Sequence, residues 1–202
     1  MGVPKSFAKT KFNKVSSVAK VLGTIGSVAA LTSFEPRAAF AAKSATPDEY
    51  QAALNDLYTV ALVMKPTKKF FDAQEYDKAR SDVKFCLDQL GLQKKVTTVI
   101  QNSIDYVDDP ELIEAGISAA ATLSNTAIQL DGTIYTLVFI PASEDGERPP
   151  NAAKYVNEAN NYYSAFFSDL DKMLALGSEE QKNTAKKAAA EKVKTLPPKL
   201  FS

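Results

Sequence analysis

The 202-residue sequence contains no histidine, no tryptophan and one cysteine. Without histidine, the Ser–His and Cys–His pairs of nucleophilic catalysis are excluded, and the commonest zinc ligand is missing. The Glu-x-x-His element of di-iron bundles and the usual axial ligand of haem are excluded for the same reason. These absences predict a protein that is not an enzyme and has no cofactor of its own.

The single cysteine, Cys86, excludes an intrachain disulfide. It stands at helical spacing with Val83, Leu87 and Leu90. We therefore expect a small buried hydrophobic side chain, because nothing in the sequence supplies a histidine to activate a thiol.

Acidic residues and glycines form no recognisable ligand motif. Acids cluster at 105–109, 144–147 and 169–171, where helix caps and solvated faces account for them. No Asp-x-Asp-x-Asp-Gly loop is present for calcium and no glycine-rich loop for phosphate. No spacing places two acids on one apolar helix face, where burial would raise a pKa for acid–base chemistry. The aromatic residues of 155–167 fit a helical core better than a pigment or quinone pocket.

The first 41 residues have the composition of a cleavable export signal. Residues 1–20 carry five lysines and no acid, residues 21–32 are small and apolar, and residues 39–41 form an Ala-x-Ala end. The apolar run is too short to span a bilayer comfortably. We predict cleavage between Ala41 and Ala42. An uncleaved amphipathic N-terminal helix is the alternative.

Removal of this presequence leaves 161 residues with 18 basic and 23 acidic side chains, a net charge of −5. A chain of this length is suited to one domain with one core. The acidic balance argues against a nucleic-acid partner, which would require a basic excess.

The remaining sequence predicts helices almost throughout. Apolar residues recur every three or four positions in 46–66, 76–107, 109–141 and 151–176. Thr46 begins the first helix in a capping box, and Pro66 is expected to end it. Gly91 is expected to bend one long second helix, and Asp109 caps the third.

Four helices with mostly short links predict an all-α, antiparallel up-down four-helix bundle over residues 42–177. Ser178 begins a second capping box, followed by an alanine- and lysine-rich helix. This basic C-terminal tail, residues 178–202, has few large apolar side chains, so we expect it to be exposed or mobile.

Two clusters of basic residues are the candidate docking sites for an acidic partner surface. The first lies at the end of the first predicted helix, with Lys78 and Arg80 further on, and the second lies in the tail. Contacts of this kind weaken as salt is added. The candidate docking residues are Lys65, Lys68, Lys69, Lys182, Lys186, Lys187, Lys192, Lys194, Lys199 and Phe201.

Residues 152–177 resemble the terminal helix of the PsbQ family, which carries a Glu-x-x-x-Tyr-Tyr element and a Leu-Gly end. Here Glu158, Tyr162, Tyr163, Leu176 and Gly177 take those places. Residues 70–100 are similar to the family's second helix. The lack of tryptophan, the 141–150 linker, the tail and the lack of a lipobox cysteine suggest an algal PsbQ-like form.

PsbQ proteins are extrinsic four-helix-bundle subunits on the lumenal face of photosystem II. The resemblance implies a non-catalytic subunit of the oxygen-evolving complex, peripheral to the membrane in the thylakoid lumen of a plastid. Its partners would be intrinsic lumenal-face subunits and other extrinsic subunits, with no small-molecule substrate. It would help to stabilise the manganese–calcium cluster and to retain calcium and chloride, which belong to the host complex.

Two alternatives remain open. PsbQ-like bundles also serve the thylakoid NADH-dehydrogenase-like complex. A different class is a secreted helical-bundle inhibitor of invertase or pectin methylesterase. Such inhibitors depend on paired cysteines, and the single Cys86 argues against this class.

Overall fold

The computed structural model describes residues 46–140 and 149–196. Over these ranges the protein is all-α, with six α-helices and one π-helical turn and no strand. No helix in the described part is both long and apolar enough to cross a bilayer. The presequence with its predicted cleavage site at Ala41 and Ala42 lies outside the described residues, as do Lys199 and Phe201.

The first described helix, α2 (Pro47–Asp72), begins as predicted and ends later than predicted. Thr46 Oγ1 accepts a hydrogen bond from the Glu49 backbone N–H at 3.2 Å, and a Glu49 carboxylate oxygen accepts one from the Thr46 N–H at 2.7 Å. This confirms the capping box. The prediction that Pro66 ends the helix is wrong, because α2 continues through Pro66 to Asp72.

The predicted long second helix is instead two helices separated by a π-helical turn. The elements are α3 (Tyr76–Lys84), η1 (Phe85–Gln89) and α4 (Leu92–Tyr106). The Leu90 N–H donates to the Phe85 carbonyl five residues earlier, at 3.0 Å. Gly91 then adopts φ 63°, a left-handed conformation that cannot continue an α-helix. Gly91 therefore separates two helices and does not bend a single one.

The later helices agree closely with the sequence pattern. Helix α5 (Pro110–Val138) begins at the Asp109 cap, whose carboxylate accepts from the Glu111 N–H at 2.9 Å. Helix α6 spans Pro150–Leu174, and α7 (Glu179–Lys194) begins at the predicted Ser178 capping box. The starts of α5 and α7 are thus set by local capping chemistry that the sequence indicates directly, whereas α6 begins at Pro150 without a side-chain cap.

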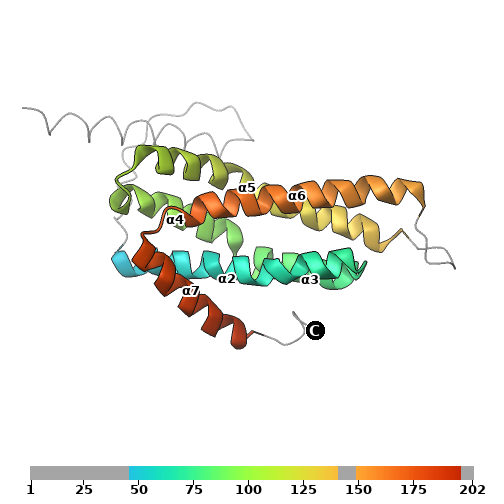
Figure 1. The fold of residues 1–202 in the computed structure, drawn as a ribbon, viewed down its shortest axis with the longest axis horizontal. Coiled ribbons are helices and arrows are strands. Elements are labelled where there is room, and N and C mark those ends of the chain that lie inside the picture. The colour runs from blue at the N-terminus through green and yellow to red at the C-terminus, as the bar shows by residue number, and fades with distance from the viewer. Residues whose placement is uncertain (1–45, 141–148, 197–202) are drawn as a thin grey trace, which may run out of the picture. The chain divides into compact units, whose positions relative to one another are not determined.

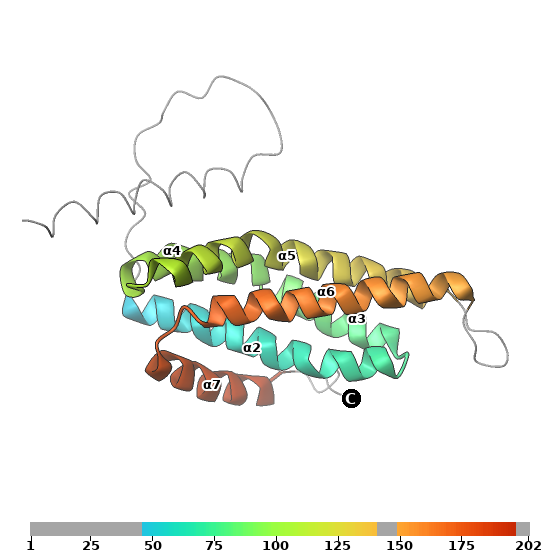
Figure 2. The ribbon, with the colours of Figure 1, turned by 45° about the horizontal axis from the view of Figure 1, so that its top comes forward.

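The helices pack laterally around a shared apolar core. Figures 1 and 2 show α5 and α6 running side by side, with α7 lying against α2. Helix α2 also packs on α3 and α4, and α3 and α4 pack on α5. The largest fully buried side chains come from α2, α4, α5 and α6, among them Leu57, Leu92, Leu130, Phe166 and Leu170.

Helix α7 is packed, contrary to the expectation of an exposed or mobile tail. Ala185 and Ala189 are fully buried, and their small side chains allow α7 to approach α2 closely. Lys192 Nζ binds Asp56 Oδ1 of α2 at 2.7 Å, and Lys95 Nζ of α4 binds the other oxygen at 2.5 Å. Burial acts to raise the pKa of Asp56, but hydrogen bonds and charge from both lysines outweigh it and hold the pKa below its ordinary value.

We predict that Ala185→Glu releases α7 from α2 without unfolding the other helices, because a carboxylate at this buried position has no cationic partner and must move into water. Amide hydrogen exchange of residues 179–194 should accelerate at least about tenfold, since tenfold corresponds to about 1.4 kcal/mol of local stability. Ala190→Glu, at an exposed position of the same helix, is the control. Equal acceleration of amide exchange in both variants would contradict the packing of Ala185 against α2.

Candidate docking site at the proline turn of α2

Pro66 lies inside α2, next to three of the predicted docking lysines. We call residues Met64–Lys69 the proline turn. Proline has no N–H, so the carbonyl four residues earlier, that of Leu62, loses its helical donor. An interior proline costs about 3 kcal/mol relative to alanine. Because α2 nevertheless continues for six residues, contacts from neighbouring helices must stabilise this turn.

The first of these contacts comes from Tyr163 on α6. Its hydroxyl oxygen lies 3.0 Å from the Met64 carbonyl oxygen and 3.2 Å from that of Lys65. Burial raises the pKa of Tyr163 to about 12, so the hydroxyl stays protonated and acts as the donor. Tyr163 therefore attaches α6 to the carbonyl groups of the proline turn.

The second contact comes from Asp82 on α3. Asp82 is fully buried, and its Oδ2 accepts a hydrogen bond from Thr67 Oγ1 at 3.1 Å. The same Thr67 hydroxyl lies 3.4 Å from the Val63 carbonyl oxygen. Asp82 Oδ1 has no hydrogen-bond partner in the described structure. Burial raises the pKa of Asp82 to about 7, against a smaller lowering by the Thr67 hydrogen bond.

Cys86 lies one helical turn beyond Asp82 and is almost completely buried, which confirms the expected hydrophobic role. Burial, and then the charge of Asp82, raise the pKa of the Cys86 thiol far above its ordinary value. The thiol is therefore neutral and enclosed in the core.

The outer side of the proline turn is cationic. Lys65 and Lys69 are exposed, and neither makes an ion pair with another described residue. Lys68 pairs with Asp72 one turn later. Lys78 pairs with Glu75 at 3.0 Å, while Arg80 turns toward α5 and binds Asp131 at 3.0 Å. The structure thus brings the three lysines of α2 together and separates Arg80 from them.

The lysines of the tail lie on α7, which packs on the same helix α2. Three of them have acidic partners: Lys182 with Glu179, Lys192 with Asp56 and Lys194 with Glu191. Lys186 lies 5.9 Å from the centre of the Tyr58 ring, and Lys187 is exposed without an ion pair to a described residue. Under the name cationic surface we group two sets of lysines, those of the proline turn and those of α7, although the contacts of α7 with α2 lie earlier in α2, at Gln51, Asp56 and Tyr58. Its members are Lys65, Lys68, Lys69, Lys182, Lys186, Lys187, Lys192 and Lys194.

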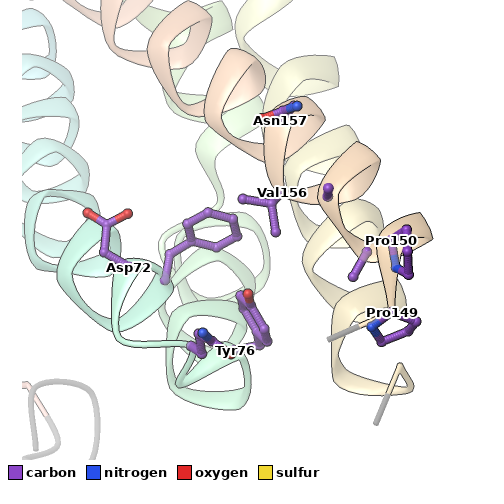
Figure 3. Close-up of a pocket in the computed structure, with 10 residues that line it drawn as sticks. Asp72, Tyr76, Pro149, Pro150, Val156 and Asn157 are labelled. Carbon is purple, nitrogen blue, oxygen red and sulfur yellow. The ribbon is translucent and has the colours of Figure 1, made fainter. Parts of the chain in front are cut away.

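A hollow of about 620 Å³ lies beside the end of α2 (Figure 3). Asp72 and Tyr76 border it on one side, and the start of α6 borders it on the other. Asp72 is its one carboxylate and is already paired with Lys68, so the hollow adjoins the cationic surface. The lining residues are Phe71, Asp72, Gln74, Tyr76, Pro149, Pro150, Ala152, Ala153, Val156 and Asn157.

Helix α5 presents an exposed face without net charge, which we call the uncharged face. Ile128, Tyr135 and Phe139 are 54%, 44% and 65% exposed, which is unusual for side chains of this size. The only charged residue between positions 115 and 139 is Asp131, which Arg80 neutralises. The Arg80 guanidinium also lies 4.2 Å from the centre of the Tyr135 ring and holds this side chain in place.

Sequence reasoning found the lysines and missed the buried contacts behind them. Asp82 is three residues from Ala79 and four from Cys86, on the same helical stripe. Its burial could therefore have been predicted from this spacing. Tyr163 was recognised only as a core aromatic, because a hydroxyl bonded to another helix leaves no sequence pattern. No group of three or more potential metal ligands gathers among the residues that the structure describes.

The chain matches no protein-family model, no curated protein and no solved structure.

We predict that Tyr163→Phe destabilises the protein by about 1 kcal/mol, because the Met64 and Lys65 carbonyls lose a half-buried donor. The melting temperature should fall by about 2–4 °C for a domain of this size. Tyr162→Phe is the matched control, since the Tyr162 hydroxyl makes no such bond to α2. Thermal unfolding that is the same for both variants would show that the Tyr163 hydroxyl does not stabilise the proline turn.

Proposed function

We propose that this protein is a non-catalytic extrinsic subunit of the photosystem II oxygen-evolving complex, docked peripherally on the lumenal membrane face. The observation that carries the proposal is the cationic surface, in which lysines without an ion pair to a described residue project from a turn fixed by contacts to α3 and α6. Docking needs such a fixed arrangement of charge, because ordering flexible side chains on binding costs free energy.

The proposed architecture is an antiparallel up-down four-helix bundle with α7 added to its outside. In this arrangement α2, the α3–α4 segment, α5 and α6 are the four members. The capped helix starts and the lateral packing of α5 with α6 support it. A bundle of this kind offers long, stable helix faces on which docking residues keep their relative positions.

Charge supports an acidic docking partner. Lys65, Lys69 and Lys187 are exposed and lack an ion pair to a described residue, so a carboxylate-bearing surface would meet unneutralised cations. Electrostatic complementarity of this type speeds association and selects the partner. The mature chain is acidic as a whole, and the cationic surface therefore stands out against the rest of the molecule.

The uncharged face of α5 supports a role inside an assembly. Exposed apolar patches on otherwise charged proteins mark sites of protein contact. Ile128, Tyr135 and Phe139 provide such a patch, at a distance along the chain from the proline turn. A subunit with one cationic and one uncharged surface is suited to contact intrinsic subunits of photosystem II and a neighbouring extrinsic subunit.

In this proposal the inorganic ions are bound by the partner subunits and not by this protein. Calcium, chloride and the manganese–calcium cluster belong to the host complex, and this protein would help to retain them by covering their access route. Washing thylakoid membranes with high salt should release the protein and lower oxygen evolution at low calcium or chloride. Retention of the protein, or unchanged oxygen evolution after its release, would contradict the proposal.

We predict that the double variant Lys65→Glu/Lys69→Glu rebinds salt-washed thylakoid membranes at least about tenfold more weakly than the wild type, because two attractive contacts become repulsive. The difference should shrink as salt is added. The measurement is a sedimentation binding curve at several salt concentrations.

The control is Lys154→Glu, which reverses the charge of an exposed lysine on α6, outside the cationic surface. Equal weakening by the control would mean that net charge matters and that the proline turn does not dock.

A further inference from the structure

We propose that Asp82 is a proton-binding site that fixes the proline turn of α2 to α3 when protonated and loosens it when ionised. The evidence for the proton-binding site is the geometry of the contact between α2 and α3. Its consequence for docking rests on the proposed function, because the docking lysines Lys65, Lys68 and Lys69 flank Thr67 in the same turn.

The burial of Asp82 is the first observation. Its side chain is fully removed from solvent, one oxygen accepts a single hydrogen bond from a neutral hydroxyl, and the other has no partner in the described structure. A buried carboxylate is normally paired with a cation or held by several donors. Asp82 has neither, so its environment favours the neutral acid.

The neighbouring groups supply no compensating charge. From α2 the residue that faces Asp82 is Thr67, while Lys65 and Lys69 lie on the exposed side. From α5 the charge that contacts α3 is Asp131, which is partly exposed and bound to Arg80. On its own helical segment Cys86 is a neutral buried thiol. Tyr163 of α6 contacts the other side of the proline turn and is also neutral.

The direction of the hydrogen bond between Asp82 and Thr67 can reverse when Asp82 gains or loses its proton. When Asp82 is ionised, the Thr67 hydroxyl donates to Oδ2 at 3.1 Å, and the Val63 carbonyl at 3.4 Å receives nothing from it. When Asp82 is protonated, its O–H donates to Thr67 Oγ1, and the Thr67 hydroxyl is free to donate to the Val63 carbonyl. The neutral form therefore links α3, Thr67 and the α2 backbone in one continuous chain.

The location gives this reversal a mechanical consequence. Pro66 has already removed one helical hydrogen bond from this part of α2, and η1 begins three residues after Asp82. An ionised carboxylate must gain water, which requires α3 to separate from the proline turn.

The sign of the pH dependence follows from the raised pKa of about 7, against an ordinary value near 4. Between these values the folded protein binds more protons than the unfolded chain, so this group makes stability fall as pH rises from about 4 to about 7. Docking by the lysines of the turn should instead weaken as pH rises through about 7, because Asp82 ionises there in the folded protein.

The test is a comparison of wild type with Asp82→Asn, which keeps the shape of the neutral acid and cannot ionise. The ratio of the wild-type to the variant unfolding constant should increase at least about tenfold between pH 5 and pH 8, since one pKa unit is a factor of ten. Asp77→Asn, at an exposed position of α3, is the control and should give a constant ratio. A wild-type to Asp82→Asn ratio that changes less than twofold would overturn the proposal.

Two further measurements remain informative if Asp82→Asn folds poorly. The carbon-13 signal of the wild-type Asp82 carboxyl should titrate near neutral pH, and a midpoint near 4 would overturn the proton site. Thr67→Val should move the midpoint upward, because the ionised form loses its donor, and Thr67→Ser should restore it. An unchanged titration midpoint in Thr67→Val would show that Thr67 is not part of the hydrogen-bond chain.

Docking is tested separately by sedimentation with salt-washed thylakoid membranes at pH 6 and pH 8. Wild type should bind more weakly at pH 8, and Asp82→Asn should lose most of this change. Equal pH dependence in both proteins would overturn the coupling to docking. If no variant binds at either pH while the stability ratio still changes, the proposed function fails and the proton site stands.

Discussion

The continuation of α2 through Pro66 is the constraint on which the rest of the structure depends. A proline at this position favours a helix end, and an end here would place Lys68 and Lys69 on a loop. Instead, Tyr163 from α6 and Asp82 from α3 contact the turn from inside. Because both contacts are polar, they fix the direction of the turn as well as its distance from the neighbouring helices.

Burial of Asp82 has a cost that an apolar side chain would avoid. Replacing buried polar groups by well-packed apolar ones is often neutral or stabilising, so stability alone does not explain an aspartate here. A group whose protonation changes near neutral pH explains it better, since the neutral acid leaves the Thr67 hydroxyl free to donate to the Val63 carbonyl and the ionised form does not. The same residue thereby links the internal packing of α2 with α3 to the solution outside.

The all-α character and most helix starts were predictable, because capping boxes and 3.6-residue periodicity are local properties. Thr46, Asp109 and Ser178 begin helices where the sequence indicates. The failures at Pro66 and Gly91 have different causes. Pro66 is tolerated because distant residues compensate for it, whereas Gly91 takes a left-handed conformation that the periodic stripe on both sides conceals.

The candidate site was predictable in its charged part only. Exposed lysines are visible in the sequence, but their grouping depends on how helices pack: α7 lies on α2, and Arg80 turns away to Asp131. The lack of large apolar residues in the tail predicts an exposed helix or a mobile segment. Its alanines bury little area each, yet they permit the close approach that brings Lys192 to Asp56.

Zero-length carbodiimide crosslinking on intact thylakoid membranes, followed by mass spectrometry, tests the central claim most directly. It joins lysines to carboxylates only where they are in contact. The account predicts links from Lys65, Lys69 or Lys187 to acidic residues of photosystem II subunits. Links confined to lysines outside the cationic surface, such as Lys154, or to proteins of an unrelated complex, would contradict it.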